Sequence, residues 1–171
     1  MEFFDLILAR RSIRAFANKP VEDRKLEQIL QAARAAPSAG NLQAYEIYAV
    51  RRPEARSALA AAALGQDFVR AAPVVLVFCT NEERCSGKYG ERGRRLYALQ
   101  DATISCAFAM LAAADLGLGT VWVGAFHDDE VWKTIGSPRG HRPVAMLPVG
   151  YPAEKPDEAG RRPLSDLVHW L

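Results

Sequence analysis

The sequence predicts a protein of the α+β or α/β class, in which helices and strands are mixed along the whole chain. Amphipathic stretches with a helical repeat alternate with short apolar runs of strand length. No internal repeat and no low-complexity linker interrupts this order. The 171 residues are 50% hydrophobic and 25% charged, as is ordinary for a globular protein, and we expect one domain, residues 1–171, around one core.

The first half of the chain predicts three helices and two strands. In the second helix Leu26, Ile29 and Ala33 recur at helical spacing, and Pro37 ends the pattern. The second strand is apolar throughout, which is typical of a strand buried on both faces. We expect the helices at residues 2–10, 23–36 and 53–64, and the strands at 46–50 and 74–79.

The second half predicts a long apolar helix over residues 94–116. It is rich in alanine and apolar on more than one side, which indicates a central helix packed against other helices or a partner subunit. Residues 80–95, which include three glycines, predict a mobile loop before it. We expect strands at 120–123 and 142–150, a short helix from Asp128 to Gly136, and a proline-rich basic tail.

Charge and composition exclude several classes of function. The net charge of +2 argues against a nucleic-acid partner, while arginines clustered in three places favour a small local anion. The three cysteines form no CxxC pair and the histidines are far apart, so we expect reduced thiols and no metal site. With no secretory signal and no run of about 18 apolar residues, we expect a cytoplasmic protein outside the membrane.

Residues 10–14 read Arg-Arg-Ser-Ile-Arg and are a candidate phosphate site. Each guanidinium group is permanently charged and can place two N–H donors on two oxygens of a phosphate group. The alternative interpretation is a charged helix end, because arginines interact favourably with the helix dipole there.

Residues 37–43 read Pro-Ser-Ala-Gly-Asn-Leu-Gln and are a candidate site for a flat polar ring. Most of these residue types are also ordinary in turns. Turn formation accounts less well for Asn41 and Gln43, which would point to the same side of an extended stretch. Together with the arginine cluster, the segment predicts a phosphorylated cofactor that carries a ring system.

Residues 117–124, Gly-Leu-Gly-Thr-Val-Trp-Val-Gly, are not a dinucleotide-binding fingerprint. The glycines follow a helix and precede a strand, whereas that fingerprint requires a strand followed by a helix. One interpretation is a helix end and tight turn, and another is that Val123 and Gly124 present backbone groups to a ring edge. Trp132 and Cys106 are interpreted as core residues, and no Ser/His/Asp order supports hydrolysis.

These three motifs, together with the ending from Gly150-Tyr151-Pro152 to Val168-His169-Trp170, resemble the nitroreductase family along nearly the whole chain. The resemblance implies an FMN-dependent oxidoreductase of the α+β class. It implies a three-layer α-β-α sandwich around a mixed, mainly antiparallel sheet, in an entwined homodimer with two FMN sites at the interface. The C-terminal segment, residues 155–171, would then extend over the partner subunit.

The resemblance also assigns contacts to FMN. The phosphate and ribityl contacts fall on Arg10, Arg11, Ser12 and Arg14. The loop from the other subunit is Pro37, Ser38, Ala39, Gly40, Asn41 and Gln43. Val123 and Gly124 would face the flavin N5 and O4 edge, and either Arg161 or Arg162 would reach the phosphate. Ala44 and Tyr45 depart from the family pattern, and only Gln66 is available as a donor on the pyrimidine side.

The implied reaction is ping-pong. NADH or NADPH reduces the flavin, and a nitroaromatic, a quinone or another small electron acceptor then takes the electrons. This chemistry requires no acid or base from the protein, so no catalytic residue is assigned. Two alternatives stay open: a reductive dehalogenase of the same fold, and a flavin-binding redox sensor or store without turnover.

Overall fold

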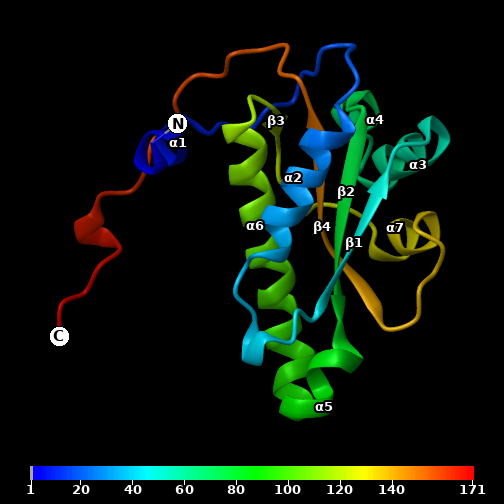
Figure 1. Cartoon of the computed structure of the whole chain (residues 1–171), viewed down its shortest axis with the longest axis vertical. Helices are drawn as coiled ribbons and strands as arrows, with labels where there is room; N and C mark the ends of the chain where they lie inside the picture. Colours follow the sequence, from blue (N-terminus) through cyan, green and yellow to red (C-terminus); the bar gives the residue numbers. More distant parts are fainter. Residues whose placement is uncertain (1) are drawn as a thin grey trace.

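A four-stranded sheet forms the middle layer of the molecule (Figure 1). The structure is a computed structural model and describes residues 2–171. Strands β1 (Tyr45–Val50), β2 (Val74–Asn81), β4 (His141–Gly150) and β3 (Gly119–Thr120) lie side by side in that order, each antiparallel to its neighbour. Ser12, which lies outside these strands, makes a parallel ladder contact with Thr120 of β3. The predicted α+β class with a mainly antiparallel sheet is therefore confirmed.

Strand β2 supplies both faces of the core. Val74, Leu76 and Phe78 pack on one side of the sheet, and the alternate residues Val75, Val77 and Cys79 pack on the other. Successive side chains of a strand point to opposite faces, so an entirely apolar strand buries side chains in two layers at once. The prediction of a strand buried on both faces is confirmed.

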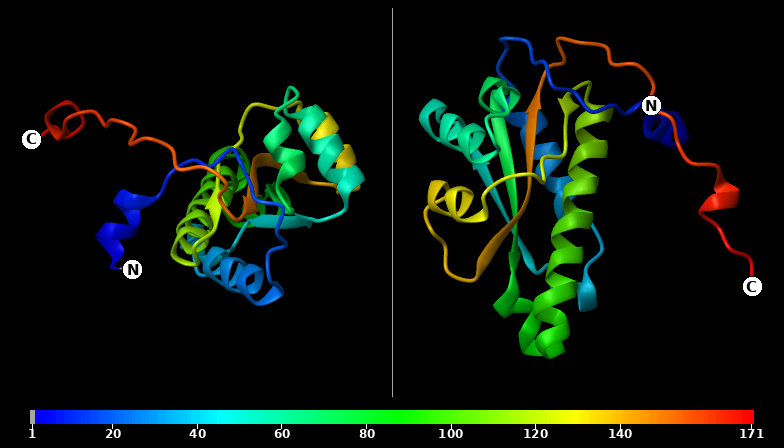
Figure 2. Two further views of the ribbon diagram at one scale, coloured as in Figure 1. Left: turned by 90° about the horizontal axis from the view of Figure 1, so that it is seen from above. Right: turned by 180° about the vertical axis from the view of Figure 1, so that it is seen from behind.

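Helices cover both faces of the sheet (Figures 1 and 2). Helices α2 (Asp23–Arg34) and α6 (Ala98–Asp115) pack on one face. The other face carries α3 (Pro53–Ala62), α4 (Asp67–Ala71) and α7 (Asp128–Thr134). The three-layer arrangement implied by the resemblance is confirmed.

The segment before α6 differs from its prediction. Residues 80–95 contain helix α5 (Glu82–Arg92) and the beginning of a five-residue π-helical segment, η2 (Gly93–Tyr97), so the predicted loop is wrong. The side chain of Asn81 accepts a hydrogen bond from the backbone N–H of Arg84 at the helix start. Gly90 departs from helical geometry at φ +57°, where glycine is tolerated. The glycines therefore bend this helical run without abolishing it.

Two further elements differ from expectation. Helix α4 was not predicted, because its five residues are too few to show a repeat. The predicted strand at 120–123 is shorter, since β3 ends at Thr120 and Val123 makes only a single ladder contact with Met146. The other predicted elements are present, with ends that differ by a few residues.

Helices α5 and α6 form one run, Glu82–Asp115, that is long and apolar enough to cross a membrane by length and composition alone. The core helix of a soluble protein passes the same test. Residues Cys106, Ala109 and Ala113 of this run pack into the core beside the sheet. We therefore interpret the run as a core helix. Within this chain, 39% of its apolar 18-residue stretch is buried.

The two ends of the chain extend away from the sheet (Figure 2). Helix α1 (Phe3–Ala9) exposes 76% of Phe4 and 67% of Leu8. The tail contains one short 3-10 turn, η3 (Leu164–Asp166), and exposes 92% of Trp170. Large apolar side chains gathered on extended segments are typical of surfaces that a partner covers.

Candidate functional site

The arginine motif is held against the end of the sheet. The backbone N–H of Ile13 donates to the carbonyl of Thr120 at 2.9 Å, and Ser12 makes the parallel ladder contact with the same residue. A Cβ atom at Gly119 would lie 2.8 Å from the Ile13 side chain, so glycine is needed for this close approach. The ladder contact fixes the backbone of residues 10–14 where β3 follows α6.

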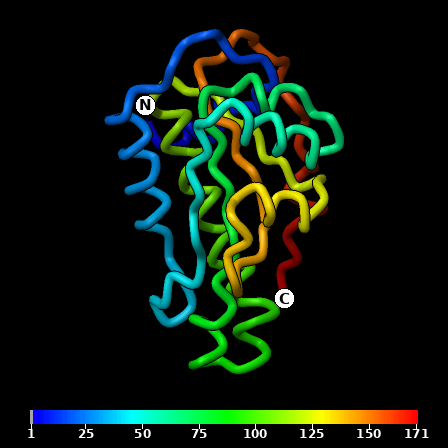
Figure 3. The backbone as a smooth tube through the Cα atoms, turned by 90° about the vertical axis from the view of Figure 1, so that its right-hand side faces the viewer, coloured from blue at the N-terminus to red at the C-terminus, as the bar shows by residue number. Residues whose placement is uncertain are grey.

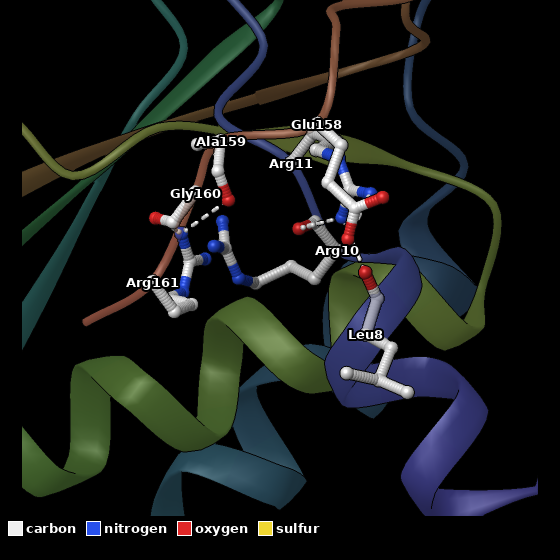
Figure 4. Close-up of polar contacts among 7 residues, drawn as sticks. All are labelled: Leu8, Arg10, Arg11, Glu158, Ala159, Gly160 and Arg161. Carbon is white, nitrogen blue, oxygen red and sulfur yellow. Dashed lines mark hydrogen bonds and ion pairs between the residues drawn. The ribbon is translucent and has the colours of Figure 1, made fainter. Parts of the chain in front are cut away.

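Three guanidinium groups gather beside this segment: those of Arg10, Arg11 and Arg161 (Figure 4). Nη1 of Arg10 is buried and has no hydrogen-bond partner among the described residues. Burial, followed by the charges of Arg161 and Arg11, lowers the pKa of the Arg10 guanidinium. A buried unpaired donor among like charges is costly, so an anion bound beside this cluster would be stabilising.

The neighbouring charged groups supply no partner to Nη1 of Arg10. Arg11 donates to the carbonyls of Leu8 and Arg10, and its Nη2 lies 3.7 Å from the exposed carboxylate of Glu158 (Figure 4). Arg161 donates through Nη1 to two carbonyls of its own segment, at 3.0 Å each. None of these contacts supplies an acceptor to Nη1 of Arg10.

Arg14 and Arg162 are placed differently from the other arginines. The side chain of Arg14 is exposed, and its backbone N–H donates to the carboxylate of Glu154, which also accepts from the N–H of Ala15 at 3.1 Å. Arg162 donates to the carbonyl of Asp166 at 2.8 Å. The structure therefore places Arg161, and not Arg162, beside Arg10.

A pocket of about 450 Å³ lies next to the arginine cluster. The end of α1, the turn that joins α6 to β3 and the beginning of the tail line it, including Arg10, Arg11, Gly119 and Lys155. Its volume lies within the range of small-molecule sites, roughly 300–1,000 Å³. A charged donor set opening on such a pocket can hold a phosphorylated small molecule.

The polar loop at residues 37–43 is a tight turn and not the extended stretch that was predicted. It contains the 3-10 turn η1 (Ala39–Asn41), and φ is positive at Gly40 (+56°), Asn41 (+57°) and Gln43 (+49°). The hydroxyl of Ser38 accepts from the backbone N–H of Gln43 at 3.0 Å and closes the loop. Gln43 Nε2 donates to the carbonyl and side-chain oxygens of Asn41, at 2.7 and 3.1 Å. The two amide side chains do meet, but through this turn.

Asp101 of α6 anchors the loop and was missed by the sequence reasoning. Its side chain is buried, and its two oxygens accept from the backbone N–H groups of Ala39, at 2.9 Å, and Ala44, at 3.2 Å. The one signal in the sequence was a carboxylate within an otherwise apolar helix, because such a group is rarely buried without partners.

The two motifs lie at opposite ends of α6 (Figure 3). Asp101 holds the loop near the start of the helix, and Ala114 lines the arginine pocket near its end. Asp101 and Ala114 are 13 positions apart in the chain, which corresponds to about 20 Å along a helix at 1.5 Å per residue. One chain therefore does not bring its own two motifs together.

In the third motif, residues 117–124, only some of the backbone groups are accessible to a ligand. The N–H of Val123 donates to the carbonyl of Met146, and its carbonyl accepts from the N–H of Met146, at 2.9 Å each, so the Val123 N–H is not free for a ligand. Gly124 is exposed, and Gln66 donates to the carbonyls of Ala63 and Ala125 at 2.9 and 3.3 Å. The structure thus brings Gln66 beside the turn after Val123 and leaves Gly124 as the residue with open backbone.

Known proteins share part of this sequence and its fold. Residues 7–66 and 60–151 match the family model described as Nitroreductase family. A protein of Thermus thermophilus named NADH dehydrogenase is 33% identical over 190 residues, which cover 95% of this chain and 93% of that protein.

Two solved structures have a similar fold. Nitroreductase A from Vibrio parahaemolyticus superposes with a TM-score of 0.90 at 32% identity, covering 98% of this chain and 74% of that one. NADPH:FMN oxidoreductase from Vibrio harveyi, solved with NAD+, superposes with a TM-score of 0.90 at 31% identity. The match covers 98% of this chain and 76% of that one.

Proposed function

Because the chain belongs to the nitroreductase family, we propose that it is an FMN-dependent oxidoreductase that uses NADH or NADPH to reduce small electron acceptors. The observation that carries the proposal is the buried, unpartnered Nη1 of Arg10 beside Arg11 and Arg161. Relatives named FMN reductase, from Bacillus subtilis, and NADPH-flavin oxidoreductase, from Vibrio harveyi, support the choice of cofactor and reductant.

The residues present fit the phosphate end of FMN. A phosphate dianion would supply the acceptors that Nη1 of Arg10 lacks and would relieve the repulsion among the three guanidinium groups. The pocket of about 450 Å³ beside them has room for the chain that links the phosphate to the ring. Ser12 follows Arg10 and Arg11 in the chain and would add a hydroxyl group to the donor set.

We propose that the functional unit is a homodimer whose sites combine both chains. The arginine pocket and the loop at residues 37–43 lie at opposite ends of α6, so a site containing both needs the loop of a second copy. The exposed apolar side chains of α1 and of the tail, including Phe4, Leu8 and Trp170, supply the contact surface. In this arrangement residues 155–171 extend over the partner.

Bound FMN would supply the hydride and electron-transfer chemistry. The chain's own residues bind and orient it: Arg10, Arg11 and Arg161 hold the phosphate group, and the Ser38–Gln43 loop of the second copy lies against the ring. We expect the exposed backbone of Gly124 to contact the ring edge. The amide nitrogen of Gln66 already donates to the carbonyls of Ala63 and Ala125, so Gln66 would support the turn that carries Gly124. No group of the protein has to donate or remove a proton.

We expect NAD(P)H and the acceptor, a nitroaromatic or a quinone, to occupy the same place in turn, which gives ping-pong kinetics. The test is to purify the full chain, record its visible spectrum, release and identify any flavin, and follow NAD(P)H oxidation with each acceptor. Parallel double-reciprocal plots support the proposal. A colourless protein that takes up no FMN would overturn it, and a yellow protein without turnover would indicate a flavin store or sensor.

A further inference from the structure

Asp101 joins the two ends of the polar loop to helix α6, which lies on one face of the sheet. One carboxylate oxygen accepts from the N–H of Ala39, where the turn begins, and the other accepts from the N–H of Ala44, where the turn ends. The side chain is 2% exposed. Because the two bonds span the loop, its entrance and exit are held by one rigid group on α6.

The loop between these two bonds has a backbone that does not form readily by itself. Asn41 and Gln43 lie in the left-handed region, which residues other than glycine rarely adopt, and Gly40 lies there too. Such conformations persist when the surrounding structure holds them, and they concentrate where proteins bind ligands. The Ser38–Gln43 bond closes the loop from within, whereas Asp101 ties it to the body of the protein.

Packing around Asp101 reinforces the anchor. Ala44 is completely buried against Cys85 of α5 and Ala98 of α6, in a small apolar cluster. Burial, and then the nearby Asp101 charge, raises the pKa of the Cys85 thiol, so the carboxylate lies close to α5 as well. Loop, α5 and α6 therefore meet at this carboxylate.

We propose that Asp101 is the positioning residue that holds residues 38–43 in the conformation that binds the flavin ring. The proposal rests on the proposed function, because the ligand of the loop is the FMN of that site. Asp101 is buried beneath the loop and acts through the backbone of Ala39 and Ala44. Only a group with two acceptor oxygens and no donor can serve both amides, so asparagine cannot replace it.

The test compares Asp101→Asn with Ser105→Ala in the full-length protein. Asparagine has nearly the size of aspartate but offers one acceptor, and its amide nitrogen would face a second N–H donor. Ser105 is a matched control, because it is buried one turn further along α6 and donates to the carbonyl of Ala33 in α2 at 3.1 Å, and not to a group of residues 38–44. Each variant removes hydrogen bonding from the same helix.

Two readouts are measured: the FMN dissociation constant by fluorescence titration, and amide hydrogen exchange in the flavin-free chain. In Asp101→Asn we expect FMN affinity to fall about tenfold or more, since fewer molecules hold the binding-competent loop. We also expect the amides of Ala39 and Ala44 to exchange about tenfold faster or more. Ser105→Ala should change neither readout, although both variants lower the unfolding midpoint.

Equal losses of affinity in the two variants, or unchanged affinity in Asp101→Asn, would overturn the positioning role. Fast exchange of Ala39 and Ala44 in the unmodified chain would also overturn it, even where the variant fails to fold. If the unmodified chain binds no FMN, the proposed function fails, and the exchange data alone decide whether Asp101 fixes the loop.

Discussion

The guanidinium group of Arg10 lies against that of Arg161, although the two residues stand near opposite ends of the chain (Figure 4). Both are positively charged, and Nη1 of Arg10 is buried without a hydrogen-bond partner in residues 2–171. Such an arrangement lowers the stability of the flavin-free protein and becomes favourable when an anion binds between the two groups. Arg10 and Arg161 therefore contribute to ligand binding and not to the stability of the flavin-free fold.

Replacing Arg10 by Met should weaken FMN binding without destabilising the flavin-free chain. Methionine keeps an apolar stem but removes the unpaired charge, so the unfolding midpoint should stay the same or rise. The loss of charged hydrogen bonds should cost about 1.5–3 kcal/mol, roughly 10- to 150-fold in affinity. Fluorescence titration and thermal unfolding check both parts. A lower midpoint together with unchanged affinity would contradict the assignment.

Arg161→Ala and Arg162→Ala form a matched pair of neighbouring substitutions. Arg161 lies beside Arg10, whereas Arg162 donates to the carbonyl of Asp166 within the tail. FMN affinity should fall about tenfold or more in the first variant and change little in the second. Riboflavin, which lacks the phosphate, should bind equally to both. An equal loss of FMN affinity in the two variants would show that the tail lies differently in the working protein.

Gly40→Ala and Gly65→Ala should cost similar stability but differ at the flavin site. Both glycines have positive φ, +56° and +76°, so alanine adds about 1–2 kcal/mol of backbone strain in each. A Cβ at Gly40 would also meet the hydroxyl of Tyr89, at the flexible end of that side chain, which can move aside at little cost, whereas no atom of the described residues lies within 4 Å at Gly65. Urea unfolding should give comparable losses, while only Gly40→Ala lowers FMN affinity. Equal FMN affinity in the two variants would show that the turn at Gly40, beside Tyr89, does not shape the flavin site.

Stability should fall as the pH rises above about 9, because buried thiols cannot ionise in the folded chain. Burial, and then the charge of Glu46, raises the pKa of Cys79 from 9.0 to about 12. Because the pKa of Cys79 is higher in the folded chain than in the unfolded chain, its contribution to the free energy of unfolding is complete below pH 9. That contribution is lost between pH 9 and 12. Cys79→Ala should reduce the decline by about 1.4 kcal/mol per pH unit in that window. Urea unfolding of the flavin-free chain at pH 8, 10 and 11 measures it. The same slope in both proteins would exclude Cys79 as the cause.

The main layers of the fold could be predicted from the sequence because each carries a repeat of its own. Leu26, Ile29 and Ala33 repeat at helical spacing, and Val74–Cys79 is apolar without interruption. Helix α5 could not be predicted, because its glycines indicate a loop and its stability comes from Cys85, which packs against distant residues. Local propensity was overridden by packing between segments.

The candidate site divides in the same way. Arginine indicates an anion wherever it clusters, so Arg10 and Arg11 could be found from composition alone. The choice between Arg161 and Arg162 depends on how an irregular tail crosses the end of α1, and no periodic pattern encodes that path. Asp101 was missed for a related reason, since its two partners are backbone N–H groups of a distant loop, which look the same in any sequence.

The last prediction concerns the shared site. Arg10→Met and Asn41→Ala alter two motifs that lie at opposite ends of α6. In a homodimer with composite sites, each variant therefore damages both sites. After subunit exchange, a mixed dimer has both changes in one site and neither in the other. Equal mixing makes half of the dimers mixed, so about a quarter of the sites, and of the activity, should return. Differently tagged chains verify that mixed dimers form, and each variant mixed with itself is the control. Mixed dimers without restored activity would show that the two motifs do not meet across the interface, and an active monomer would remove the shared site altogether.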